Sequence, residues 1–152
     1  MATGNPPASE LEGIEPMHRP NLAPYFRWLT VITAGLVLIT ALFAGRGLWL
    51  NRSFIDYHEM LANLLFLLAV AQVVLVLAIR IPGALGKRLL VMNGLLAVLM
   101  IVQTGLGYVG RDEMEARAWH FPLGVLIFGL ATLIAAMAWQ MQSERGDASS
   151  QG

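Results

Sequence analysis

The chain has 152 residues, 10 Lys and Arg against 10 Asp and Glu, no cysteine, and 57% hydrophobic but only 13% charged residues. Soluble domains usually carry roughly 25% charged residues, so this chain has too little polar surface to face water on all sides and is expected to lie in a membrane. The balanced charge excludes a nucleic-acid partner, and the lack of cysteine excludes disulfides, iron–sulfur clusters and thiolate zinc sites.

Residues 1–24 hold five of the seven prolines and are expected to form a disordered cytoplasmic tail. Four stretches free of Asp, Glu, Lys and Arg follow, and each is long enough to cross, as a helix, a hydrocarbon core about 30 Å thick. Residues 143–152 form a second polar tail. The pattern predicts an all-α integral membrane four-helix bundle, up-down-up-down, over residues 25–142, with helices at about 26–47, 57–80, 87–109 and 116–141.

Basic residues in the short loops set the expected orientation. The segment 80–88 carries three basic residues and no acidic one, which favours the cytoplasmic side. Both termini would then be cytoplasmic, and a bacterial cytoplasmic membrane is the expected location. The opposite side keeps four of the ten basic residues, all arginines.

Polar residues inside the apolar stretches are few. The first predicted helix carries Thr30, Thr33 and Thr40 on one stripe, which predicts a packing seam. The absence of an acidic or basic side chain within the stretches argues against a proton or ion pump. Three amides are expected to bond neighbouring helices: Gln72, Asn93 and Gln103.

Two histidines open the second and fourth predicted helices, which begin on the same side of such a bundle. His58 starts the segment HEMLANLLFLLA and His120 starts HFPLGVLIFGLA, and the two segments are identical at six of twelve positions. The match is suggestive of a duplicated helical hairpin. A duplication would relate the hairpins by a pseudo-two-fold axis, across which the paired histidines could ligate one metal.

Haem b is the cofactor that fits two histidine ligands without a third, whereas zinc takes three or four ligands. Ala62 and Gly124 lie one turn below the histidines and leave room for a flat macrocycle, although small residues equally serve close helix packing. Haem propionates pair well with arginine. The candidates on the histidine side are Arg46, Arg52, Arg111 and Arg117, for which nearby acidic residues are alternative partners.

Three segments carry a family resemblance: YHEMLANLLFLL at 57–68, QTGLGYVG at 103–110 and WHFPLGVLIFGL at 119–130. Over residues 26–141 the layout resembles one four-helix half of haem A synthase, a membrane enzyme of two fused bundles, or a related small haem-b-binding family. The resemblance implies that His58 and His120 are the axial ligands of a single haem. The chain departs from that family in having one bundle, no cysteine pair in a loop, and no glutamate just before the first histidine.

The sequence thus favours a haem-b-binding membrane protein that transfers electrons or carries haem within a complex, with a quinone or a redox protein as partner and no catalytic residue of its own. A cofactor-free membrane subunit or assembly factor is the alternative, since histidine is also an ordinary residue at a membrane interface. A haem A synthase-like enzyme is a further alternative and would require a homodimer to supply the second haem site.

Overall fold

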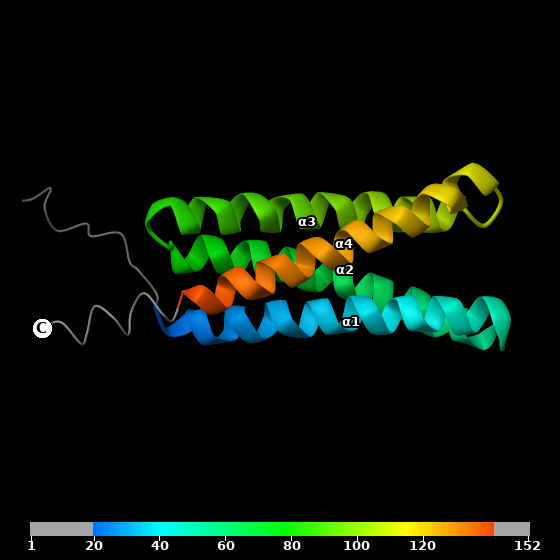
Figure 1. Ribbon diagram of the computed structural model, residues 1–152, viewed down its shortest axis with the longest axis horizontal. Helices are drawn as coiled ribbons and strands as arrows, with labels where there is room; N and C mark the ends of the chain where they lie inside the picture. The colour runs from blue at the N-terminus through cyan, green and yellow to red at the C-terminus, as the bar shows by residue number, and fades with distance from the viewer. Residues whose placement is uncertain (1–19, 142–152) are drawn as a thin grey trace, which may run out of the picture.

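The computed structural model describes residues 20–141, which form four long helices after one short turn (Figure 1). Each α-helix has 27 residues and so extends about 40 Å, which exceeds the roughly 30 Å of a bilayer core. All four are apolar enough to cross a membrane, so the chain is an integral membrane protein. The elements are the 3-10 turn η2 (Pro20–Leu22), α1 (Ala23–Trp49), α2 (Ser53–Ile79), α3 (Gly83–Val109) and α4 (Met114–Gln140).

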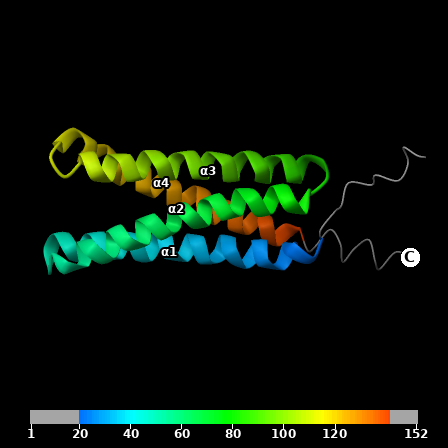
Figure 2. The same cartoon turned by 180° about the vertical axis from the view of Figure 1, so that it is seen from behind.

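The helices form the predicted up-down-up-down bundle. α1 packs against α2 and α4, and α3 packs against the same two helices, so α2 and α4 lie on a diagonal of the bundle (Figures 1 and 2). The connections 50–52 and 110–113 lie at one end, here called the histidine end, and the connection 80–82 lies at the other, here called the basic end. These neighbours confirm the predicted fold class.

A narrow seam of buried side chains on each helix forms the core. Along each helix the buried positions alternate in steps of three and four residues, which is the spacing of left-handed helix packing. The threonine stripe of α1 belongs to this seam and is buried, as predicted. The seam contains Phe26, Thr30, Thr33, Val37 and Thr40 on α1, Leu65, Ala69, Gln72, Val76 and Ile79 on α2, Gly86, Leu89, Asn93, Leu96 and Met100 on α3, and Ile127, Ala131, Ile134 and Ala138 on α4.

The seam does not run the full length of the bundle. It ends at Thr40 and Met100 on the helices that run toward the histidine end, and it begins only at Leu65 and Ile127 on those that return. Beyond these residues the hairpin of α1 and α2 diverges from the hairpin of α3 and α4 (Figures 1 and 2). The tightly packed core therefore occupies the part of the bundle nearer the basic end.

Helix ends differ from the expected bounds. Residues 20–24, expected in the N-terminal tail, form η2 and the first turn of α1, where Pro24 is tolerated because first-turn N–H groups have no helical partner. α2 and α3 each begin four residues before the expected position, because helices continue past the hydrocarbon into the polar interface. At the start of α2 the Asn51 side chain accepts hydrogen bonds from the Ser53 backbone N–H and hydroxyl, at 3.0 and 2.9 Å. The rest of the expected N-terminal tail, 1–19, and the expected C-terminal tail, 143–152, lie outside the described residues, as does residue 142, the last residue of the expected bundle.

The three amides behave differently from one another. Gln72 donates from Nε2 to the Thr33 hydroxyl on α1 at 2.6 Å, so it bonds a neighbouring helix as predicted. The prediction is wrong for Asn93, whose Nδ2 donates to the Leu89 carbonyl of its own helix at 2.7 Å. The Leu89 carbonyl lies four residues earlier, one helical turn away, where a short amide side chain can bond its own helix. Gln103 bonds α4, in the contact described next.

Candidate functional site

His58 and His120 meet across the bundle at the histidine end. Their ring centres are 6.1 Å apart and the ring planes are inclined by 66°. His58 is the sixth residue of α2 and His120 the seventh of α4, so both rings project inward at similar depth from diagonal helices. Both side chains are half-buried. The structure therefore brings together the two residues that the internal repeat had paired.

His58 is oriented by the backbone of α1. Its Nδ1 lies 2.9 Å from the carbonyl oxygen of Thr40. Because a carbonyl oxygen only accepts hydrogen bonds, Nδ1 must carry the proton, and in the neutral ring Nε2 keeps its lone pair. The ring is thus held in the tautomer that presents Nε2 as a ligand atom.

His120 is oriented in the same way by α3. Its Nδ1 donates to the Gln103 carbonyl oxygen at 3.2 Å, which again leaves the lone pair on Nε2. The Gln103 side chain folds over this ring: its Nε2 lies 3.1 Å from His120 Nε2 and donates to the His120 carbonyl oxygen at 3.0 Å. Among residues 20–141 the buried Oε1 of this amide has no hydrogen-bond partner.

The two hairpins hold their histidines by nearly equivalent contacts. Each Nδ1 bonds a carbonyl of the preceding helix, 18 residues earlier for His58 and 17 residues earlier for His120. The correspondence is not complete, because a Cβ on Gly107 would lie 3.2 Å from Cε1 of His120, whereas a Cβ on Gly45 would meet nothing within 4 Å. The two hairpins are therefore similar in how they hold their histidines as well as in sequence.

The residues around the pair are small or only partly covered. Ala62 and Gly124 are half-buried, one turn along the helices from the histidines. A Cβ on Gly124 would lie 3.2 Å from Nε2 of Gln103, so glycine there gives the amide its space. The site thus lies in the part of the bundle where the seam has ended and the hairpins diverge.

The four candidate arginines have different surroundings. Arg111 forms an ion pair of 2.7 Å with Glu59, the residue after His58, and this pair joins the α3–α4 connection to α2. Arg117 donates to two carbonyls of the same connection, those of Gly110 at 2.8 Å and Arg111 at 3.1 Å. Two of the four candidates therefore already have protein partners in the described chain.

The other two arginines lie on the α1–α2 hairpin and are exposed. The guanidinium of Arg46 lies over the ring of Phe54, 5.0 Å from its centre. Arg52 precedes α2 directly, at the connection of the hairpin. They are the arginines at this end that remain accessible to an anionic group.

The donor set at the site is limited to the two imidazoles. Over residues 20–141 the structure gathers no group of three or more His, Asp and Glu side chains around a common point. The chain holds no cysteine that could complete such a set. Two imidazoles are too few to complete a tetrahedral zinc site, whereas an iron held in a macrocycle needs only two protein ligands.

Sequence reasoning found both histidines but missed what orients them. The Thr40 carbonyl is a backbone group, which no residue type signals. Gln103 was expected only to bond another helix, and its contact with His120 Nε2 depends on the exact rotation of α3 relative to α4. Gly107 and Gly124 were the residues in the sequence that could have indicated these contacts. The His120 ring lies close to Gly107, and the Gln103 amide lies close to Gly124.

Comparison of the chain with protein-family models, with curated proteins and with solved structures found no match. The interpretation of the site therefore depends on the geometry of the histidine pair.

Proposed function

We propose that the protein binds one haem b between His58 and His120 and serves as a membrane electron carrier or as the haem-carrying subunit of a complex. The observation that carries the proposal is the separation of the rings. A metal bonded to one nitrogen of each of two opposed imidazoles, at about 2 Å, places the ring centres roughly 6 Å apart. The observed distance is 6.1 Å.

The hydrogen bonds of the two rings support the same proposal. Metal-ligating histidines usually donate their second ring N–H to a carbonyl or carboxylate, which fixes the ring and raises its basicity. His58 and His120 both do so, to carbonyls of two different helices. Holding each ring from a separate helix fixes both ligand atoms before any cofactor arrives.

One group must move for ligation. The Gln103 amide lies 3.1 Å from Nε2 of His120, in the direction from which a metal would approach. The amide is joined to the protein there by one further hydrogen bond, to the His120 carbonyl, and Gly124 leaves space beside it. Rotation of this side chain would free the ligand atom, so we expect Gln103 to turn aside when haem binds.

The propionates would meet the exposed arginines of the α1–α2 hairpin. Arg46 and Arg52 are accessible, and guanidinium groups bind carboxylates through two parallel hydrogen bonds. Arg111 could join them by exchanging its exposed ion pair with Glu59, because such pairs contribute at most about 1 kcal/mol.

Haem iron with two histidine ligands supplies one-electron transfer. With His58 and His120 both holding it, a bound haem would supply electron transfer and not the turnover of a substrate. The resemblance to haem A synthase stays a prediction, as do a quinone or redox-protein partner, a homodimer, and the cytoplasmic placement of the termini.

The test is reconstitution of detergent-purified protein with hemin, followed by visible spectra of the oxidised and dithionite-reduced forms. We expect a Soret band and sharp reduced α and β bands in the wild type, and their loss in His58→Gly and His120→Gly. His18→Gly is the matched control and should keep the spectrum. Added imidazole should restore the bands in the two glycine variants, because free imidazole can replace the missing ligand.

A wild-type protein that takes up no hemin would overturn the proposal and leave the cofactor-free membrane subunit as the remaining interpretation. So would a spectrum that survives both glycine variants, since the haem would then have other ligands. Far-UV circular dichroism of each variant checks that its helices are intact.

A further inference from the structure

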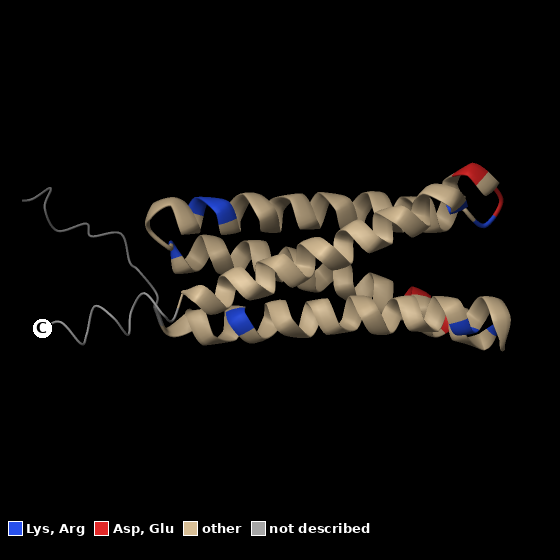
Figure 3. Ribbon diagram, in the orientation of Figure 1, with Lys and Arg blue, Asp and Glu red and all other residues tan. Residues whose placement is uncertain are grey.

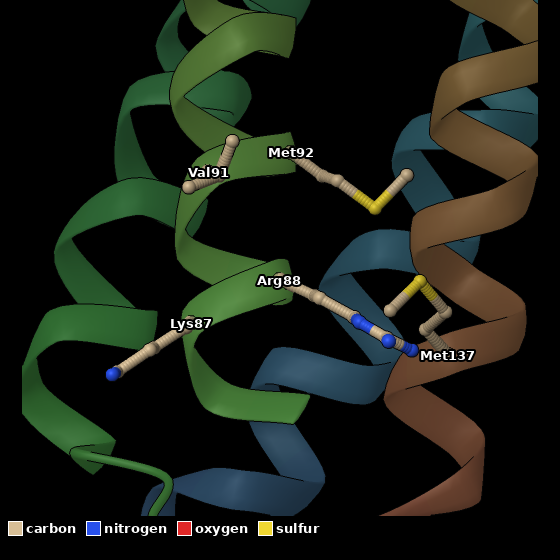
Figure 4. A pocket seen from close by; sticks show the side chains of 5 residues that line it. All are labelled: Lys87, Arg88, Val91, Met92 and Met137. Carbon is tan, nitrogen blue, oxygen red and sulfur yellow. The ribbon is translucent and has the colours of Figure 1, made fainter. Parts of the chain in front are cut away.

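We propose that the groove between α3 and α4 at the basic end binds the headgroup and one acyl chain of an anionic phospholipid. This groove, of about 470 Å³, is lined by Lys87, Arg88, Val91, Met92 and Met137 (Figure 4). Its volume is in the range of pockets that hold small ligands. It lies at the opposite end of the bundle from the histidine pair, and the inference is independent of haem binding.

Among residues 20–141, the basic end carries several basic side chains and no acidic one. The basic side chains near this end are those of Arg27, Arg80, Lys87 and Arg88, and all five acidic residues between positions 20 and 141 lie at the histidine end (Figure 3). Neither Lys87 nor Arg88 makes a hydrogen bond or ion pair with any residue of 20–141. Because Lys87 and Arg88 have no partner among residues 20–141, both are available there to an external anion.

The depth of these cations matches that of lipid phosphates. The 27-residue α3 exceeds a hydrocarbon core of about 30 Å by roughly 10 Å, so about three or four residues project at each end. Lys87 and Arg88 are the fifth and sixth residues of α3. They therefore lie at the boundary between acyl chains and headgroups, where basic pockets between helices bind anionic lipids.

The walls of the groove change from charged to apolar along the membrane normal. Arg88 extends from α3 across the groove toward Met137 of α4, and Met92 reaches into the same space one turn deeper (Figure 4). A guanidinium at the mouth can hold a phosphate through two hydrogen bonds, while the flexible thioethers below it adapt to an acyl chain. A soluble anion such as free phosphate would leave this apolar part of the groove unused.

Lys87 provides a matched control for the role of Arg88. It borders the groove, but its ammonium points to the opposite side of α3 (Figure 4). Both residues are exposed and carry the same charge, so either can be replaced without affecting the core. A general attraction to a negative membrane surface would depend on them equally, whereas binding in the groove depends on Arg88.

The test is native mass spectrometry of the full chain in an uncharged detergent, with phosphatidylglycerol and phosphatidylcholine of identical acyl chains titrated separately. We expect the wild type to bind one phosphatidylglycerol about five- to tenfold more tightly than phosphatidylcholine, as one well-placed charge near a membrane surface allows. Arg88→Gln should remove this preference, Lys87→Gln should change it by less than about twofold, and Arg88→Lys should keep part of it.

Equal affinity of the wild type for the two lipids would overturn the proposal, and the groove would then have another occupant, such as a second copy of the chain. Retention of the preference in Arg88→Gln would overturn it too, as would equal losses in Arg88→Gln and Lys87→Gln. Circular dichroism of each variant verifies the fold.

Discussion

The hydrogen bond between Gln72 and Thr33 gives a quantitative test of how polar groups stabilise this bundle. Gln72 Nε2 donates to Thr33 Oγ1 at 2.6 Å, and the threonine hydroxyl donates in turn to the Leu29 carbonyl at 2.8 Å. The hydroxyl has one proton, so this chain of bonds fixes the amide with its oxygen on the far side. That Oε1 is buried and has no partner among the residues described.

Two substitutions should therefore have opposite effects. Thr33→Val keeps the side-chain shape but leaves the Gln72 amide without its acceptor, and interhelical bonds in membranes are worth about 0.6 kcal/mol on average and about 1.7 at most. We expect a loss of roughly 1 kcal/mol in the free energy of unfolding. Gln72→Leu removes the donor together with the unpaired oxygen, so we expect it to be neutral or stabilising.

Reversible unfolding in mixed micelles with increasing dodecyl sulfate, followed by far-UV circular dichroism, measures both changes. The double variant gives the coupling, because Thr33→Val should cost less than about 0.5 kcal/mol once Gln72 is leucine. A Gln72→Leu variant less stable than Thr33→Val would refute the reasoning, since it would mean that Gln72 Oε1 has a favourable interaction.

Two further predictions concern glycines. Gly107→Ala should weaken hemin binding, because the new Cβ would lie 3.2 Å from His120 Cε1 and shift the ring. Gly45→Ala is the control at the corresponding position of the other hairpin. Its Cβ would meet nothing within 4 Å, so the hemin titration should be unchanged. Gly86→Ala should destabilise the bundle by about 1 kcal/mol or more in the same unfolding assay, because its Cβ would overlap the Ile81 carbonyl oxygen. Gly94→Ala is the control: a Cβ there meets nothing within 4 Å, so the variant should be neutral or slightly stabilising. Equal effects within either pair would contradict the packing that the structure shows.

The sequence predicted those features that depend on composition and periodicity. The four spans follow from the uncharged stretches, and the pairing of His58 with His120 follows from the repeat, because equal positions in two hairpins reach equal depths. The threonine stripe was visible for the same reason. These properties need only the helix period and the thickness of a bilayer.

Features that depend on interatomic distances could not be predicted. The third helix was expected from residue 87, but α3 begins at Gly83, so Lys87 and Arg88 lie one turn inside the helix and not at its first residues. Asn93 bonds its own helix, and the choice between Arg111 pairing with Glu59 or with another acid depends on loop geometry. In each case several partners are chemically equivalent, and only the backbone path decides among them.

The incomplete seam has a consequence for the order of assembly in the membrane. Because the closely packed residues lie between the basic end and the level of Thr40, the bundle can form without any contribution from the histidines. If haem binds as proposed, it would enter an already folded protein from the end where the hairpins diverge. Insertion and packing of the helices would then precede the binding of the cofactor.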